Sequence, residues 1–206
     1  MKKKLCSLLL ILALVLSFSA CSTPSPTEVT TAFLQAVKEQ NTEDMADLYA
    51  EGSWSLSEEA GEEADLEEDD ELSQYFVDEV FPKLLEFDYE VLEEKLDGEK
   101  AAVDVKITTY NLGDTFTAFV GEYLTQAFAL AFSDADEDAI TALGTSLFKE
   151  KAADMEKTYT ETVSIPLSQV DGAWVVDEID EESPLINALT GGLIDALDTL
   201  ENSFEK

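Results

Sequence analysis

The chain has 206 residues, of which 46 are Asp or Glu and 12 are Lys, and it contains neither Arg nor His. This net charge of −34 opposes binding to nucleic acid and to anionic lipid headgroups, because both depend on Lys and Arg. The absence of His excludes transition-metal sites and Ser–His or Cys–His catalysis. We therefore expect no cofactor and no defined metal site, and only weak, diffuse binding of divalent cations by carboxylates.

The N-terminus has the features of an export signal. Three lysines at positions 2–4 precede an apolar run, residues 5–18, that is shorter than the about 20 residues a membrane span needs. Ser19 and Ala20 are the small residues that a signal peptidase requires, and Cys21 follows them. This order resembles the lipobox of bacterial lipoproteins, in which the Cys thiol receives a diacylglycerol and becomes the mature N-terminus. The alternative is an ordinary secreted protein in which Cys21 lies one residue past the cleavage site.

The cysteine count agrees with acylation. The chain has only Cys6 and Cys21, and Cys6 leaves with the signal peptide, so the mature protein has no partner for a disulfide. Acyl chains such as palmitate on Cys21 would hold the protein on a membrane. We therefore predict a lipoprotein signal peptide over residues 1–20 and a lipid-anchored tether over residues 21–27. The predicted location is the extracytoplasmic face of the bacterial cell membrane.

Residues 28–202 are predicted to form a single α+β domain, in which N-terminal helices pack on a curved antiparallel sheet. Thr27 and Thr42 are expected to cap two short amphipathic helices. Their apolar residues recur at helical spacing: Val29, Phe33 and Val37 in the first, and Met45, Leu48 and Tyr49 in the second.

An acidic insert follows these helices. Residues 57–71, SEEAGEEADLEEDDE, are mostly Asp and Glu and include no basic residue, so charge repulsion predicts a solvated segment. A third helix is expected from about Leu72, and it should bend or end at Pro82 because proline lacks an amide hydrogen.

Two segments predict β-hairpins. Residues 86–107 alternate between apolar and polar residues on both sides of a turn at Asp97–Gly98. Residues 158–179 form the second predicted hairpin, with its turn at Asp171–Gly172. Pro166 predicts that the first strand of this second hairpin is an edge strand or carries a bulge.

Residues 114–157, between these hairpins, predict an inserted helical hairpin. Its first helix, residues 115–132, is expected to carry a broad apolar side with Glu122 as the only charge, and that side comprises Phe116, Phe119, Val120, Tyr123, Ala127 and Phe128. Ser133 and Asp136 have the spacing of a capping box for the partner helix. The buried stripe expected on the partner helix comprises Ile140, Leu143, Leu147 and Phe148.

The order of these elements resembles a known group of proteins. The segments EVTTAFLQAVKEQNTEDMADLY, FDYEVLEEKLDGEKAAVDVKITTY, DGAWVVDEI and LTGGL are similar to small lipoproteins of Firmicutes, especially clostridia, with an uncharacterised domain of the nuclear transport factor two-like type. The resemblance covers most of residues 27–195 and implies a cone of helices and curved sheet around a cavity. The acidic insert and the helical hairpin lie outside the minimal pattern. The family has no established activity, and a fold does not supply one.

Two short motifs are better explained by chance or by helix capping. Residues 146–149, SLFK, match the S-x-x-K of penicillin-recognising enzymes, but the other motifs of those enzymes are missing. Asp134, Asp136 and Asp138 have the first spacings of a calcium loop. Ala139 and Thr145 stand where that loop needs Gly and a bidentate Glu, so no metal site is predicted.

Five aromatic residues are candidates to line the implied cavity and to bind an apolar ligand, although aromatics at strand spacing are more commonly core. They are Trp54, Tyr89, Tyr110, Tyr159 and Trp174. The predicted function is a membrane-anchored binding or interaction module rather than an enzyme, with a small apolar ligand or a basic protein as its partner. The alternative is a small-molecule enzyme of the same superfamily, in which a cavity carboxylate acts as a general base.

Overall fold

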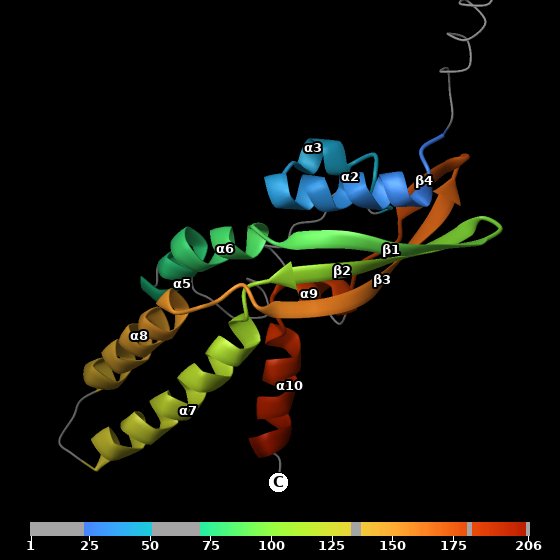
Figure 1. The fold of residues 1–206 in the computed structure, drawn as a ribbon. Coiled ribbons are helices and arrows are strands. Elements are labelled where there is room, and N and C mark those ends of the chain that lie inside the picture. Colours follow the sequence, from blue (N-terminus) through green and yellow to red (C-terminus); the bar gives the residue numbers. More distant parts are fainter. Residues whose placement is uncertain (1–22, 51–70, 133–136, 181–182, 205–206) are drawn as a thin grey trace, which may run out of the picture.

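A computed structural model describes residues 23–50, 71–132, 137–180 and 183–204. It confirms the predicted α+β class (Figure 1). Helix α2 (Pro26–Glu39) packs on an antiparallel sheet, and a helical hairpin, α7 (Leu112–Ala131) and α8 (Glu137–Ala153), is inserted between two neighbouring strands. The strands lie in chain order across the sheet: β1 (Asp88–Asp97), β2 (Lys100–Thr109), β3 (Tyr159–Val170) and β4 (Ala173–Val176).

Helix α2 begins earlier than the sequence predicts. Its N-cap is Ser25 rather than Thr27, and the Ser25 hydroxyl accepts a hydrogen bond from the backbone N–H of Glu28 at 3.2 Å. The Glu28 carboxylate accepts one in return from the backbone N–H of Ser25 at 2.8 Å. Pro26 fits the first helical position because its missing N–H would be unpaired there in any residue. The helix therefore starts inside the segment predicted as a tether.

The second predicted helix is reduced to one turn, α3 (Thr42–Met45). The chain after it runs beside β4 instead, where Tyr49 forms a parallel bridge with Val176. The N–H of Ala50 donates to the Val176 carbonyl at 2.9 Å, and the N–H of Val176 donates to the Leu48 carbonyl at 2.8 Å. Pairing with the sheet thus overrides the helical spacing of Met45, Leu48 and Tyr49.

The third predicted helix does not end at Pro82 but continues past it. It consists of α5 (Glu71–Tyr75), a π-helical turn η2 (Phe76–Val80) and α6 (Phe81–Leu85). The N–H of Phe81 donates to the carbonyl of Phe76, five residues back. This wider turn shifts the hydrogen-bond register just before the proline, so that the helix continues where a regular α-helix would be interrupted. Of the predicted acidic insert, residues 57–70 lie outside the described residues.

Both predicted β-hairpins are present, and their turns use glycine at positive φ. Gly98 has a φ of 65° in the two-residue loop between β1 and β2. Asp171 and Gly172 have φ values of 52° and 85° between β3 and β4, the signature of a type I′ turn. The pairing of β1 with β2 is irregular between Val91 and Glu93, where β1 bulges.

The prediction that Pro166 marks an edge strand or a bulge is wrong, because β3 lies between β2 and β4 and its pairing with both strands has no register shift. Pro166 is paired with Ala102 of β2, and its carbonyl accepts from the N–H of Asp177 at 3.0 Å on the β4 side. In a strand the N and O of one residue point to the same side, so the missing N–H faces β4 and not β2. The missing N–H therefore falls at the end of the short β4 ladder, whose last pair is Leu167–Val176, where it interrupts the least pairing.

The main core lies on one face of the sheet, where α2 and α9 (Pro184–Leu189) pack. Alternate residues of β2 and β3 are buried there and their neighbours are not, which is the pattern of a sheet covered on one side. A second cluster at the base of the helical hairpin joins it to α6 and to α10 (Leu193–Phe204). Its fully or almost fully buried residues include Val80, Leu84, Leu112, Phe148, Ala152 and Leu193.

The predicted helical hairpin is confirmed, and it projects from the sheet (Figure 1). The rings of Phe119 on α7 and Phe148 on α8 meet edge to face with centroids 5.5 Å apart. Gly144 on α8 lies so close to the Tyr123 ring that a Cβ there would be 3.3 Å from it. Among the described residues, no helix combines the length and apolarity needed to cross a membrane.

Candidate functional site

The residues proposed to line a ligand cavity are spread over different parts of the fold. Trp174 is 9% exposed and belongs to the core between α2 and the sheet. Tyr89 packs beside Phe87 with ring centroids 6.2 Å apart, and its hydroxyl donates to the Thr31 carbonyl at 3.4 Å. Trp54 lies outside the described residues. These contacts give Tyr89 and Trp174 roles in packing α2 against the sheet.

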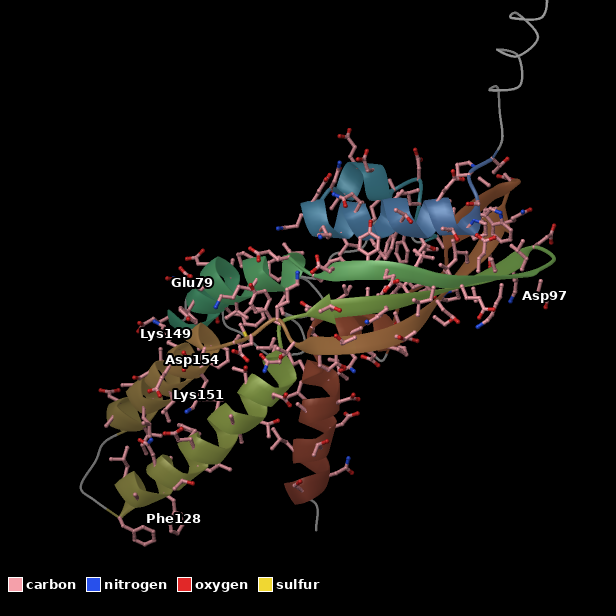
Figure 2. The ribbon with its side chains drawn as sticks, in the orientation of Figure 1. Glu79, Asp97, Phe128, Lys149, Lys151 and Asp154 are labelled. Carbon is pink, nitrogen blue, oxygen red and sulfur yellow. The ribbon has the colours of Figure 1, made fainter. Side chains whose placement is uncertain are left out.

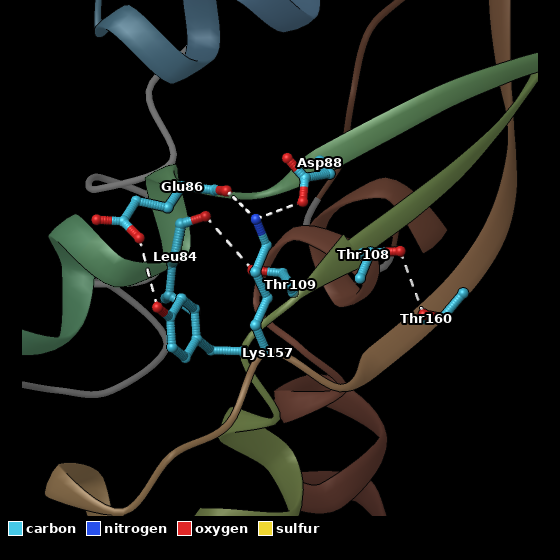
Figure 3. Close-up of polar contacts among 8 residues, drawn as sticks. Leu84, Glu86, Asp88, Thr108, Thr109, Lys157 and Thr160 are labelled. Carbon is cyan, nitrogen blue, oxygen red and sulfur yellow. Dashed lines mark hydrogen bonds and ion pairs between the residues drawn. The ribbon is translucent and has the colours of Figure 1, made fainter.

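Tyr110 belongs to a polar junction where the helical hairpin joins the sheet, and Figure 3 shows its partners Glu86, Asp88 and Lys157. Its hydroxyl donates to the Glu86 carboxylate at 3.4 Å. The ammonium of Lys157 donates to the Glu86 carbonyl at 2.6 Å and lies 2.6 Å from the carboxylate of Asp88. The hydrogen bond from Lys157 lowers the pKa of Asp88. The junction ties the chain that leaves α8 to the start of β1.

Tyr159 forms a second polar cluster with residues of β3, α9 and α10. Its hydroxyl donates to the Glu161 carboxylate at 2.7 Å. The side-chain N–H groups of the buried Asn187 face three oxygens, those of Tyr159 at 3.2 Å, Glu161 at 3.1 Å and Asp195 at 3.0 Å. Burial, followed by the bond to Glu161, raises the pKa of Tyr159, which makes its hydroxyl a weaker acid. The cluster suits the attachment of α9 and α10 to β3 better than proton transfer.

Two glycines between α9 and α10 allow the chain to pass close to Tyr110 and Tyr159. Gly191 has a φ of 64°, and a Cβ on it would lie 1.9 Å from the Tyr110 carbonyl oxygen. A Cβ on Gly192 would lie 2.6 Å from the Tyr159 ring. The Gly191 carbonyl accepts from the N–H of Gly113 at 3.0 Å. The LTGGL segment is therefore a close-packed connection between α9, α10 and the start of α7.

An ion pair joins the two helices of the hairpin. The ammonium of Lys151 on α8 lies 2.6 Å from the carboxylate of Glu122 on α7. Hydrogen bonding with Lys151 lowers the pKa of Glu122 and raises that of Lys151. At the base, the Lys83 ammonium donates to the Ala152 carbonyl at 3.0 Å near the end of α8, and Lys149 pairs with Glu71 at 2.6 Å. The lysines of this region are thus engaged within the domain.

The far end of α7 carries an apolar surface that the fold leaves exposed. Leu124, Phe128 and Phe132 are 48%, 68% and 78% exposed, and we call these three residues the distal stripe. The rings of Phe128 and Phe132 contact each other with centroids 4.8 Å apart. Phe128 lies near the end of the hairpin (Figure 2). Phe128 was predicted on the same broad apolar side as Phe119 and Tyr123, but α8 covers only the part of α7 that carries those two residues.

Sequence reasoning missed this surface because it placed Phe128 on the same broad side as Phe119 and Tyr123 and did not assign Leu124 or Phe132 to a side. The sequence does contain a signal for this surface. Leu124, Phe128 and Phe132 recur every four residues, and this series is offset by one residue from that of Phe119 and Tyr123. A helix that is apolar on more of its circumference than one neighbour can cover leaves a stripe in solvent. The distal stripe is the candidate interaction surface.

The remaining predicted sites fall largely outside the described residues. Cys21 is one of them, and so are Asp134 and Asp136 of the weighed calcium loop. Within the described ranges, no three Asp, Glu or Cys side chains gather in a way that could hold a metal ion.

Comparison with known proteins identifies one structural neighbour. No protein-family model matches the chain, and no curated protein matches it in sequence. The crystal structure of YcdA, a candidate lipoprotein of Bacillus subtilis, aligns with a TM-score of 0.50 and 12% sequence identity. The two proteins share a fold. The alignment covers 81% of this chain and 56% of YcdA, so the chain spans little more than half the length of that neighbour.

Proposed function

We propose that the protein is a lipoprotein of the extracytoplasmic face of the bacterial membrane, acylated on Cys21, and that its domain is a binding module. The order of lysines 2–4, an apolar run, Ser19, Ala20 and Cys21 is the observation that carries the anchor. The description of its structural neighbour YcdA as a candidate lipoprotein supports it. Excess negative charge and the lack of Arg and His support binding over catalysis.

The start of α2 brings the domain close to the proposed anchor. Only residues 22–24 separate Cys21 from the helix cap Ser25, a span of roughly 14 Å at full extension. The hydroxyl and the N–H of Thr27 both donate to the Glu94 carboxylate, at 2.7 and 3.0 Å, which holds the β1–β2 hairpin beside the start of α2. An anchored domain would therefore hold this end toward the bilayer.

We also propose that the domain is of the nuclear transport factor two-like type. The packing of α2 on one face of an antiparallel sheet supports this assignment, as does the insertion of the helical hairpin between two paired strands. In this proposal the hairpin is an addition to the basic cone, and it carries the exposed distal stripe.

The enzyme alternative depends on a carboxylate that could act as a general base. Glu161 is one described candidate, since its carboxylate lies beside the half-buried Tyr159. The same oxygen, Oε2, already accepts from Tyr159 and from Asn187. A general base needs an oxygen directed at its substrate, and these bonds favour the binding module.

Metabolic labelling tests the anchor. Radiolabelled palmitate should enter the wild-type protein and leave the Cys21→Ser variant unlabelled, and that variant should appear in the medium or remain as precursor. Cell fractionation should place the labelled protein in the membrane fraction. Equal labelling of both proteins would end the lipoprotein proposal.

A further inference from the structure

The distal stripe has the spacing by which an amphipathic helix contacts a partner protein. Leu124 and Phe128 lie on α7 and Phe132 is its C-cap residue, so the three occupy positions i, i+4 and i+8 and extend over about 12 Å. Large side chains at this spacing are the anchors that an amphipathic helix presents to an apolar partner surface. Aromatic anchors contribute most of the binding energy in many protein interfaces.

The charges of the hairpin restrict what can cover the stripe. The sequence has no basic residue between Lys106 and Lys149, and the charged residues in that interval are all acidic: Asp114, Glu122, Asp134, Asp136, Glu137 and Asp138. Glu122 is paired with Lys151, on the side of α7 that faces α8. The exposed Asp138 near the start of α8 and the net charge of −34 are the negative charge that a partner with Lys or Arg around an apolar face would complement.

The stripe also lies at the opposite end of the domain from the proposed anchor. The helix α2 starts beside the β1–β2 hairpin, which carries Asp97, whereas Phe128 lies at the far end of the inserted helices (Figure 2). A domain held at the start of α2 would present the stripe away from its own bilayer.

We propose that the distal stripe of α7 is the docking site for a basic amphipathic helix of a partner protein, which packs its apolar face on Leu124, Phe128 and Phe132. The proposal rests on the proposed function as a binding module and names the surface that does the binding. Insertion into a lipid surface is opposed by the acidic run that follows α7, and association of two copies is opposed by the net charge of −34.

A synthetic amphipathic helix of Leu and Lys tests the proposal. Full-length acylated protein in phosphatidylcholine vesicles is mixed with the fluorescent peptide, and empty vesicles serve as the blank. Phe128→Gln/Phe132→Gln should weaken binding about tenfold or more, because the aromatic anchors are removed. The matched control, Val77→Gln/Leu96→Gln, changes two side chains that are 60% and 62% exposed elsewhere, and it should bind as the wild type does.

Two further peptides separate the apolar contribution from charge alone. A Leu/Lys peptide of the same composition, scrambled so that no apolar face forms, should bind weakly and equally to wild type and variant. A Leu/Glu helix should not bind. Equal binding of the amphipathic Leu/Lys helix by wild type and the Phe128→Gln/Phe132→Gln variant would overturn the proposal.

A second copy of the protein or the lipid bilayer could cover the stripe instead of a partner helix. A thiol introduced as Ala129→Cys, next to the stripe, tests both of these alternatives. Cross-links between copies through this thiol would assign the stripe to self-association, and burial of a fluorophore attached to it in phosphatidylcholine vesicles would assign it to lipid; either result overturns the proposal. Palmitate labelling is measured on the same preparations, and an unlabelled chain is assayed in solution, so failure of the anchor is distinguished from failure of the stripe.

Discussion

Two regions of the molecule differ in how they bury similar apolar residues. One is the sheet with helix α2, and the other is the inserted helical hairpin. Phe33 of α2 is fully buried against the sheet, whereas Phe128 of α7 is 68% exposed. Helix α2 turns one apolar side toward one sheet face, and that face covers it. Helix α7 carries apolar residues on two sides, and α8 covers only one of them. The comparison indicates that apolar residues stabilise the fold in the first region and are available for contact in the second.

The largest expected effect comes from emptying the sheet core. Phe33→Ala should lower the free energy of unfolding by about 3–5 kcal/mol, because it removes a fully buried ring and leaves a cavity. Phe128→Ala, the matched change in the hairpin, should alter it by no more than about 0.5 kcal/mol. Urea denaturation of both variants measures the difference. Similar losses for the two would contradict the division between core and contact surface.

The second largest loss of stability is expected from a substitution in the LTGGL segment, which connects the sheet to the helical hairpin. Gly191→Ala should cost about 2–4 kcal/mol, since its Cβ would collide with the Tyr110 carbonyl at a φ of 64°. Gly98→Ala is the control: it has a similar φ of 65° but nothing within 4 Å of its Cβ, so it should cost about 1 kcal/mol. Thermal unfolding compares them, and equal shifts would show that backbone strain, and not the close contact, governs both sites.

Local patterns in the sequence predicted the elements whose causes are local. The Asp97–Gly98 and Asp171–Gly172 turns were recoverable because glycine relieves strain at positive φ, and the alternation of apolar residues in β2 reports a sheet covered on one face. The second helix was overestimated because Tyr49 pairs with Val176, a residue 127 positions further along the chain. No local pattern contains that contact.

The contacts of the candidate sites are harder to predict than the strands and turns, because they join residues that lie far apart in the sequence. Tyr159 was singled out as an aromatic residue, but its partner Asn187 is 28 residues away and carried no signal of its own. Phe128 was recognised as part of an apolar helix, yet its exposure depends on how much of α7 the second helix covers. The periodicity gives the two stripes of α7, and the packing of α7 with α8 and α10 decides which residues are buried and which are exposed.

A smaller, pH-dependent effect is expected from the ion pair within the hairpin. Because the pKa of Glu122 is lowered from its usual 4.5 by Lys151, the stabilisation is present above about pH 4.5 and is lost as the pH falls through the lowered value. Glu122→Gln should therefore unfold more easily than wild type at pH 7, and the difference should shrink at acidic pH. Asp138→Asn, at an exposed carboxylate of the same hairpin, is the control. A difference between Glu122→Gln and wild type that does not change with pH would contradict this account.

The orientation of the anchored domain is the central claim, and lipid quenching tests it most directly. Asp97→Cys and Ala129→Cys place a single fluorophore at opposite ends, because Cys6 leaves with the signal peptide and Cys21 is acylated in the proposal. In vesicles with headgroup-labelled quencher lipid, the account predicts strong quenching at residue 97 and weak quenching at residue 129. Stronger quenching at residue 129 would place the distal stripe on the bilayer and contradict the account.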